Sequence, residues 1–468
     1  MSVLLGATLA SACTFGTGIA YATDHGDTAI YNGEARNDAR LTDFFTTNRG
    51  DKLVVVIDTN PTIGTASQSP TQSQTTYYFP TDVTFKAHID NHSKVSFDDP
   101  ARNAHYGGRI VDPAGIKENF VFTFSFDNSN QLTTTMSSPD TELGISGFYP
   151  TTVLQGDLVY VLGSGFTADT RVNVGGTLAL LTHTISDNVL VFIAPFGSNS
   201  GAITLRNPDT STITAQSIRS ASPLFVKSFQ GINKVALENY NNIIANTAVT
   251  DAIKTGNVLA LADIGLPVKT FAGLRDDPFI RTTATGKNIA AMALEMPQSL
   301  FTHGRQKVLI SWAASGYDAI SGHFSDVAGG SFISMFEPEK NLINTLHPSQ
   351  HVAALEAAAQ LSPPVLLPCQ TPYQNGIVVA PFNTDCSESE RMLKSPDVAI
   401  FDTTKPQSYP NGRALTDDVV DLIAPYDPRV NGLLYNPTNG ENVNGSTSPT
   451  VNDVPLSDTF PYFGLPQP

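Results

Sequence analysis

Alternating apolar and polar residues dominate the chain and predict β-strands. The clearest run is 119–127, where Phe120, Phe122, Phe124 and Phe126 fall on one face of an extended strand. A phenylalanine stripe on a strand is most simply the core-facing side of a β-sandwich. We therefore expect this strand to pack into a main core.

Weaker versions of the same pattern predict further strands. A β-branched run ends at the turn Asn60-Pro61, and a longer alternating region holds two strands around Pro80. The strand regions are 53–58, 76–90, 288–297 and 308–312.

Helical periodicity is rarer. One or two helices are predicted at 237–263, with a break at Thr255-Gly256-Asn257. An alanine-rich helix is predicted at 349–361, and Pro363-Pro364 stops it. The remaining segments are rich in turn residues.

Short strands follow one another closely in residues 144–220, and each ends at a Gly, Asn or Pro turn. This spacing is typical of an immunoglobulin-like sandwich. The order of its segments resembles the IPT/TIG domain, and the resemblance implies a spacer or a protein- or sugar-recognition unit without catalytic residues. The segments that carry it are 145–150, 156–166, 172–176, 189–195 and 201–209.

Most of the remaining chain resembles a secreted bacterial family catalogued as domain of unknown function 4331. The resemblance implies an exported, β-rich body and no particular activity. Ile280-Arg281 departs from it, because a second aromatic and an acidic residue are usual there. The matching positions are Asp24-His25, Asp43-Phe44-Phe45, Ile89-Asp90-Asn91, 271–279, 288–297, 411–421 and 460–462.

These patterns predict a mainly β protein: a split β-rich domain interrupted by an immunoglobulin-like β-sandwich, with few helices. We expect a signal peptide at 1–22 and the first half of the β-rich domain at 23–142. The IPT/TIG domain is expected at 143–221, and the second half of the β-rich domain at 222–468.

Composition agrees with this class. The chain has 468 residues, of which 15% are charged, with 35 glycines and 31 prolines, which disfavours long amphipathic helices and coiled coils. The net charge of −16 makes nucleic acid and anionic lipid poor partners, because both need clustered cations.

Residues 1–22 have the features of an export signal. Residues 3–12 are apolar or small, and Ala20-Tyr21-Ala22 is a cleavage site of the A-x-A type. A lipoprotein anchor on Cys13 is a minor alternative. We therefore expect a secreted, periplasmic or cell-surface protein. No later run approaches the ~20 apolar residues of a transmembrane helix, and we expect no such segment.

Two cysteines, Cys369 and Cys386, remain after cleavage. In an exported protein they should form a disulfide. The bridge would be worth roughly 3 kcal/mol and would be structural, because no C-x-x-C spacing is present.

The most unusual stretch is 271–279, which has no helical or strand period of its own. It combines Arg275 with Asp276 and Asp277, and a second set combines Arg413 with Asp417, Asp418 and Asp421. Adjacent buried acids need a compensating cation or several hydrogen-bond donors.

Three interpretations fit these two sets. We favour a structural network in which Arg275 and Arg413 pair with the acids and hold distant loops together. A Ca²⁺ site on Asp276, Asp277, Asp417, Asp418 and Asp421 is the second. The third is a hydrolase that uses Asp276, Asp277, Asp417 and Asp418 as acid, base or nucleophile.

The histidines give a weaker signal. His88 and His92 flank Asp90 at alternate positions, and His347 and His351 have i, i+4 spacing. No H-E-x-x-H motif or Cys/His ligand set occurs. We interpret these histidines as exposed polar residues.

Familiar catalytic motifs are absent from the sequence. It contains no G-x-S-x-G elbow, no P-loop and no dinucleotide-binding unit. We therefore predict an exported binding or scaffolding protein without catalytic activity, whose partner is a protein or carbohydrate at the cell surface. The alternatives are an extracellular hydrolase acting on carbohydrate or polymer, and a Ca²⁺-stabilised adhesion protein. We expect no cofactor other than Ca²⁺.

Overall fold

The computed structural model describes most of the 468 residues. The described residues are 30–31, 34–63, 79–208, 215–228, 231, 233–280, 284–302, 304, 306–316, 324–330, 337–361, 387–419, 422 and 451–468. The signal segment, Cys13, Cys369, Cys386 and Asp421 lie outside these ranges, so what was predicted for them stays a prediction.

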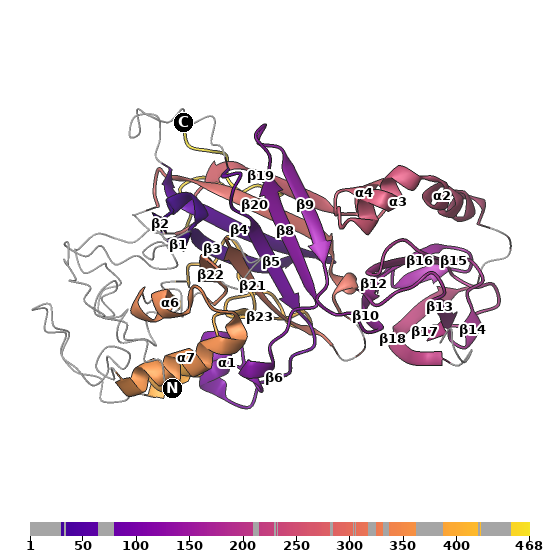
Figure 1. The fold of residues 1–468 in the computed structure, drawn as a ribbon, viewed down its shortest axis with the longest axis horizontal. Helices are drawn as coiled ribbons and strands as arrows, with labels where there is room; N and C mark the ends of the chain where they lie inside the picture. Colours follow the sequence, from indigo (N-terminus) through magenta and orange to yellow (C-terminus); the bar gives the residue numbers. More distant parts are fainter. Residues whose placement is uncertain are drawn as a thin grey trace, which may run out of the picture.

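The first sheet of the main lobe contains four antiparallel strands. Its order is β19 (Lys269–Asp276), β20 (Asn288–Pro297), β4 (Lys52–Ile63) and β3 (Leu41–Arg49). Every residue of β20 is buried, because this strand lies between β19 and β4 (Figure 1) and its two faces pack into two different apolar clusters.

The second sheet of the main lobe runs β22 (Asp326–Ala328), β21 (Val308–Ser315), β5 (Phe85–Asp90), β8 (Phe120–Phe126) and β9 (Leu132–Ser137), with β23 (Ala399–Asp402) also paired to β21. Its strands are antiparallel. Small two-stranded ladders join β1 (Ile30–Tyr31) to β2 (Glu34–Ala35) and β6 (Val95–Ser96) to β7 (Arg109–Ile110).

The two sheets of the main lobe pack face to face. Phe120, Phe122, Phe124 and Phe126 are all buried in one core with apolar residues of β3, β4 and β20. The burial of β8 alternates strictly along the strand, which confirms the phenylalanine stripe as the inner face of a sandwich.

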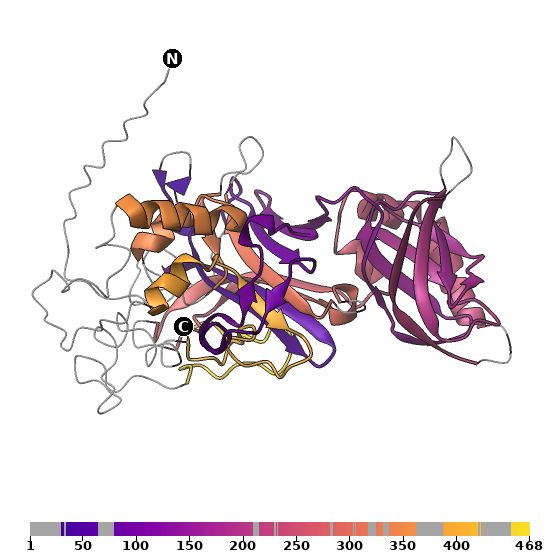
Figure 2. The same cartoon turned by 90° about the horizontal axis from the view of Figure 1, so that it is seen from below.

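Residues 144–227 form a small lobe beside the main one (Figure 2). One of its sheets is β10 (Gly144–Tyr149), β12 (Leu158–Ser164), β16 (Val189–Ile193) and β15 (Thr182–Thr184). The other is β11 (Thr152–Leu154), β18 (Ala215–Lys227), β17 (Gly201–Pro208), β13 (Arg171–Val174) and β14 (Thr177–Leu178). The two sheets enclose a core of their own, as expected for an immunoglobulin-like sandwich.

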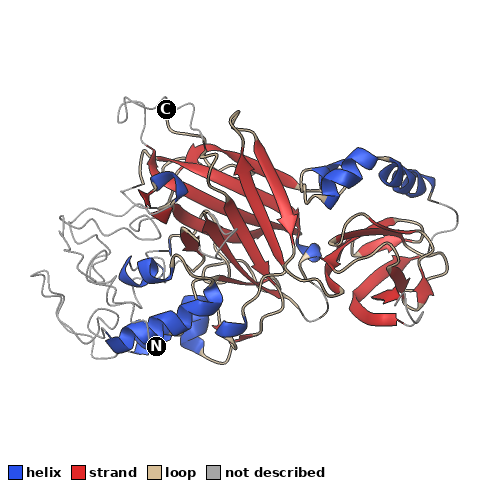
Figure 3. Cartoon of the chain, in the orientation of Figure 1, coloured by secondary structure: helices blue, strands red, loops and turns tan. Residues whose placement is uncertain are grey.

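Helices are few and lie at the edges of the sheets (Figure 3). Those beside the small lobe are α2 (Lys234–Ala245), α3 (Thr247–Lys254) and α4 (Ala260–Asp263); the others are α1 (Pro100–Tyr106), α6 (Glu337–Ile343), α7 (Pro348–Leu361) and α9 (Ser387–Leu393), with 3₁₀ turns η1 (Asn37–Ala39), η2 (Pro113–Gly115) and η3 (Gln298–Leu300). No helix in the described part of the chain has the length and apolar character needed to cross a bilayer. The prediction of a mainly β protein is confirmed.

Two details of the expected secondary structure were wrong. Residues 271–276, where we saw no period, belong to β19, because the strand is stabilised by pairing with β20 along its whole length. The predicted turn at Asn60-Pro61 lies inside β4, where Asn60 takes a positive φ of 56° and the strand continues to Ile63.

The predicted break at Gly256 is confirmed, and a further break follows Ala245.

Polar and apolar contacts join the two lobes. Asn91 Nδ2, directly after β5, donates to the carbonyl of Phe301 at 2.8 Å and to that of Ser146 in the small lobe at 3.4 Å. Ser299 Oγ donates to Phe148 O at 2.7 Å. Residues of β12 and β16 share the main core through α2–α4, so the lobes form one packed unit.

Gly147 of the small lobe packs directly against the backbone of the main lobe, and a side chain there should separate the lobes. A Cβ atom on Gly147 would collide with the backbone of Ser299 and Leu300. We expect Gly147→Ala to lower the free energy of unfolding by about 1–3 kcal/mol. Calorimetry should resolve two unfolding transitions where the natural protein shows one.

Gly176→Ala is the matched control for this experiment. Gly176 has a φ of +88° and open space around it, so the change strains the backbone without touching the lobe contact. This variant should keep a single transition at a lower temperature. A single transition in Gly147→Ala as well would contradict a rigid contact between the lobes.

Candidate functional site

Asp276 is a point of attachment for the C-terminal segment 451–468. It ends β19 and is fully buried. Its Oδ2 accepts a hydrogen bond from Asn452 Nδ2 at 2.7 Å, and its Oδ1 accepts one from Gln467 Nε2 at 2.9 Å. Burial raises the pKa of Asp276 to about 7, aided by the charges of Asp453 and Asp277, and these amide hydrogen bonds act in the opposite direction.

Arg275 does not neutralise this acid, contrary to the expected network. Its guanidinium carbon lies 4.2 Å from the centre of the Phe271 ring, and Nη1 donates to the carbonyl of Leu274 at 2.7 Å. Successive side chains of a strand point to opposite faces, so Arg275 and Asp276 diverge. No ion pair of Arg275 occurs among the described residues, and burial lowers its pKa.

Arg413 forms a buried ion pair with a different acid. Its Nη1 lies 2.5 Å from Asp43 Oδ1, and its guanidinium carbon lies 4.3 Å from the centre of the Phe45 ring. Asp58 stands directly opposite Asp43 across β3 and β4. Burial raises the pKa of Asp58 well above its usual value, and the charges of Asp43 and Asp277 add to the effect, which Arg413 opposes. A proton on Asp58 therefore relieves the repulsion between facing acids.

The other acids of the two predicted sets serve local structure where they are described. Asp277 Oδ1 accepts a hydrogen bond from the Phe279 amide at 3.0 Å. Asp417 Oδ2 accepts from the Ala414 amide at 2.8 Å and from Gln407 at 3.0 Å. Asp418 is half-buried. The described residues contain no group of three His, Cys, Asp or Glu placed to hold a metal, and a Ca²⁺ site that includes Asp421 stays a prediction.

Two of the histidines that were expected to be exposed, His351 and His88, are buried. His88 is enclosed by aromatic rings. It stacks on Trp312 with 4.9 Å between ring centres. Its Nδ1 lies 3.3 Å from Glu118 Oε1, and His347 Nε2 lies 3.0 Å from Glu118 Oε2. His88 is buried because β5 lies between β8 and β21 and the ring packs between Trp312 and Phe324.

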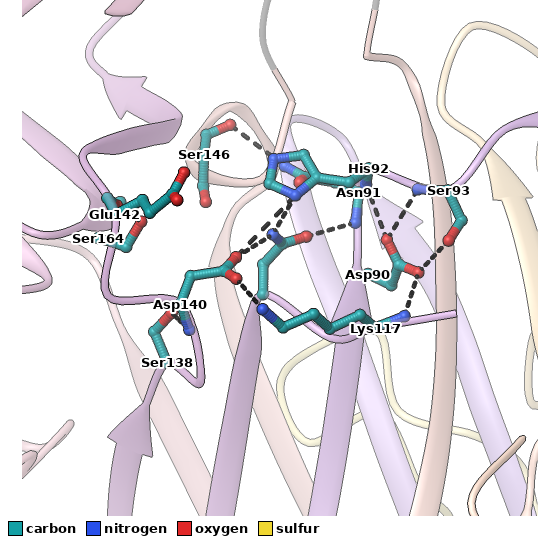
Figure 4. A network of polar contacts seen from close by, with 12 residues as sticks. Asp90, Asn91, His92, Ser93, Lys117, Ser138, Asp140, Glu142, Ser146 and Ser164 are labelled. Atoms are coloured by element: carbon teal, nitrogen blue, oxygen red, sulfur yellow. Dashed lines mark hydrogen bonds and ion pairs between the residues drawn. The ribbon is translucent and has the colours of Figure 1, made fainter. Parts of the chain in front are cut away.

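A polar network lies where the lobes meet (Figure 4). Asp90 ends β5 and accepts hydrogen bonds from the amides of His92 and Ser93 at 2.7 and 2.9 Å, which folds the chain into a tight turn. Asn119 Oδ1 accepts from the Asn91 amide at 2.7 Å. These buried contacts fix the backbone from which the exposed His92 side chain projects.

Asn119 also orients two groups at the surface of this network. Its Nδ2 donates to His92 Nδ1 at 2.6 Å and to Asp140 Oδ2 at 3.1 Å. Because His92 Nδ1 accepts a hydrogen bond, the imidazole carries its proton on Nε2. Lys117 Nζ lies 2.6 Å from Asp140 Oδ1, and this ion pair raises the pKa of Lys117.

His92, Lys117 and Asp140 line a groove of about 610 Å³ where the lobes meet, which we call the junction groove. The main lobe contributes His92 and Lys117, and the small lobe contributes Ser164. The rest of the lining is Pro139, Asp140, Thr141, Glu142, Leu143, Gly144 and Ile145. The groove therefore offers an ammonium group, an imidazole N–H and carboxylates in one hollow, which suits a polar ligand.

The sequence indicates only part of this site. It singled out Asp90 and His92 but not Lys117, Asn119 or Asp140. The available signal was the polar run Asp90-Asn91-His92-Ser93 directly after a buried strand. This polar run contacts residues 138–146 only because the two lobes pack together. No local pattern in the sequence predicts that packing.

The small lobe matches the family model of the IPT/TIG domain over residues 143–225. This confirms the predicted resemblance for that part of the chain. The resemblance of the remaining chain to domain of unknown function 4331 stays a prediction. A comparison with curated proteins gives no match.

Solved structures show partial similarity. An auxiliary nutrient binding protein from Bacteroides ovatus ATCC 8483 is 20% identical, with a TM-score of 0.18, over 19% of this chain and 22% of that one. The gamma-CGTase from alkalophilic Bacillus clarkii is 10% identical with a TM-score of 0.16, over 59% of this chain and 35% of that one. A marsupial T cell receptor is 8% identical with a TM-score of 0.12, over 58% of this chain and 93% of that one. At these scores the similarities do not identify a ligand.

The raised pKa of Asp276 predicts a pH-dependent stability. The folded pKa of about 7 exceeds the unfolded value of about 3.9, so the folded state binds more protons between these values. The stabilisation that the folded state gains from the protonated Asp276 carboxyl group is complete below about pH 4. It is lost as the pH rises through about 7. The free energy of unfolding of the natural protein minus that of Asp276→Asn should fall across this range.

Chemical denaturation at several pH values checks this expectation. Gln467→Ala removes one hydrogen-bond donor but keeps the carboxyl group, so its difference from Asp276→Asn should still fall with pH. A difference between the natural protein and Asp276→Asn that stays constant from pH 4 to 8 would show that Asp276 titrates normally.

Glu118 should be essential to the packing of α7 against the sheet. Burial alone would raise its pKa, but the hydrogen bonds with His347 and His88 outweigh burial and hold the pKa well below its usual range. We expect Glu118→Gln to lower the free energy of unfolding at pH 7 by about 1.5–3 kcal/mol, because hydrogen bonds to a charged group are lost. Urea denaturation measures the change. The exposed Glu238→Gln in α2 is the control and should change it by less than about 0.5 kcal/mol; equal effects would refute the role of Glu118.

Proposed function

We propose that the protein is an exported binding protein, without catalytic activity, that holds a polar ligand in the junction groove. The observation that carries this proposal is the groove itself, about 610 Å³ in volume, with polar side chains from both lobes. Support comes from the IPT/TIG domain that forms one wall, because recognition of proteins or sugars is what the resemblance implies.

The chemistry of the groove favours a carbohydrate. Sugar hydroxyls both donate and accept hydrogen bonds, and the groove presents donors on Lys117 and His92 beside acceptors on Asp140 and Glu142. The Lys117–Asp140 pair compensates its own charge, so the site does not demand a strongly charged ligand. The buried turn at Asp90 holds His92 in place before binding, which lowers the entropic cost of association.

The two alternative functions have less support. A hydrolase would need an exposed pair of aspartates, whereas Asp276 and Asp277 are buried and the Asp276 oxygens accept amide hydrogen bonds. For Ca²⁺-stabilised adhesion, no described residues form a ligand group. We therefore favour binding at the junction groove.

The experiment is a glycan microarray with the mature protein, followed by calorimetric titration of the best oligosaccharide. His92→Ala and Lys117→Ala should each weaken binding about tenfold or more, because each removes a hydrogen bond that involves a charged or fixed donor. Lys254→Ala is the matched control, since Lys254 is also exposed and pairs with an aspartate at 3.2 Å; it should bind normally. Binding that is unaffected in both groove variants, or no binding to any glycan, would contradict the proposal.

A further inference from the structure

The outer edge of β19 is a sheet edge without a neighbouring strand. β19 is the last strand of its sheet and pairs with β20 alone (Figure 1). The strand β9, which contacts β19, also ends its sheet, but there the Met136 amide donates to Gly256 O at 2.7 Å and the Val258 amide donates to Thr134 O at 2.9 Å. The outer edge of β9 is therefore covered, whereas no described residue covers that of β19 with hydrogen bonds of this kind.

The register of the sheet determines which residues of β19 face this edge. Directly after the strand, the Asp277 amide donates to Lys287 O at 3.1 Å and continues the register of the β19–β20 pair. Alternate residues of an antiparallel strand bond to the same partner strand. The residues between them, Thr270, Ala272 and Leu274, therefore direct their N–H and C=O groups outward.

The faces of β19 are covered, but its edge is open to solvent. Ala272 and Leu274 pack on the main core, and Phe271 packs on the other face against the cluster that contains Val54. Residues 270–275 nevertheless all remain half-buried, so the exposed surface of the strand lies along its edge. A row of exposed backbone N–H and C=O groups is a template for the addition of another strand.

Arg275 places an uncompensated charge at this edge. Its Nη1 donates to Leu274 O at 2.7 Å, which confirms that this carbonyl points away from β20. No acid pairs with Arg275 in the part of the chain that the structure describes, and burial lowers its pKa. A carboxylate brought to the edge would therefore stabilise the charged guanidinium.

The charges along the edge favour an acidic partner. Lys269 and Arg275 lie at the two ends of an uncharged run, and Glu295 pairs only with Lys269, at 2.8 Å. Two copies of β19 paired antiparallel about Ala272 would bring Lys269 of one copy opposite Arg275 of the other, and like charges in opposite positions are unfavourable. An acidic strand suits this edge better than a second copy of the chain.

We propose that the outer edge of β19 binds an extended acidic peptide segment of a partner protein by strand addition, with Arg275 binding a carboxylate side chain of the peptide. The outward groups of Thr270, Ala272 and Leu274 would pair with the peptide backbone. In this mode the main-chain hydrogen bonds supply affinity and the side-chain contacts supply specificity. Arg275 exchanges Leu274 O for the carboxylate, which frees that carbonyl for a peptide N–H. The site does not depend on the junction groove or on its ligand.

Titration calorimetry with three short peptides, all with blocked ends, tests this site. The first alternates valine with threonine and contains two glutamates, and the second has glutamines in their place. The third repeats the first with N-methyl groups on alternate backbone nitrogens. The glutamate peptide should bind, and the glutamine peptide should bind about fivefold or more weakly, because it lacks the charged partner of Arg275. The N-methylated peptide should not bind, because it lacks the backbone donors.

Two variants locate the binding on β19. Arg275→Gln should weaken binding of the glutamate peptide by about fivefold or more and leave that of the glutamine peptide unchanged. Ala272→Pro removes an outward N–H that does not bond to β20, a position where sheet edges tolerate proline, and it should abolish binding of both peptides. Arg206→Gln, which changes an exposed arginine on β17 of the small lobe, is the control and should leave binding unchanged. Circular dichroism confirms that each variant is folded.

The proposal is overturned if the glutamate peptide does not bind, if its N-methylated form binds equally well, or if Arg275→Gln leaves its affinity unchanged. Self-association of the natural protein in sedimentation that Ala272→Pro abolishes would also overturn it, because a second copy of the chain would then occupy the edge. The N-methylated peptide tests the edge without changing the protein, so the test holds even if Ala272→Pro does not fold.

Discussion

One buried side chain, Asn91, hydrogen-bonds to both lobes at their contact and works together with the apolar core that the lobes share. Its amide nitrogen donates to the carbonyls of Ser146 and Phe301, and its backbone amide donates to Asn119. Each buried polar group left without a partner costs about 1–3 kcal/mol. Asn91 thus ties the end of β5, the first strand of the small lobe and the segment after η3 to one geometry, and the junction groove is a consequence of that geometry.

Buried acids are the second constraint, and each is accommodated differently. Asp43 is paired with Arg413, Asp276 accepts amides from the C-terminal segment, Glu118 faces two imidazoles, and burial raises the pKa of Asp58, which favours its neutral form. Four solutions occur in one acidic chain because carboxylates on neighbouring strands cannot all be charged in a medium of low polarity. These contacts connect segments distant in sequence, so they serve as crosslinks of the main lobe.

Local patterns in the sequence predicted the parts of the fold that depend on local physics. The phenylalanine stripe, the helix at 349–361 and the IPT/TIG domain follow from alternation, alanine content and turn spacing. β19 was not predicted because Gly273 and Arg275 obscure its alternation and its stability comes from pairing with β20. The partner of Arg413 was missed because the meeting of Asp43 and Asp58 depends on strand register. The burial of His88 and the junction groove depend on tertiary packing, which local patterns in one sequence do not predict.

We infer that the buried contacts of Asn91 help to hold the lobes in one fixed arrangement and thereby form the junction groove in advance of any ligand. Hydrogen–deuterium exchange of the natural protein and of Asn91→Ala, followed for peptides that cover 88–93 and 144–149, tests it most directly. We expect slow exchange in both peptides of the natural protein and faster exchange in both peptides of the variant, while β8 stays protected. Acceleration of 88–93 alone, with 144–149 unchanged, would contradict it.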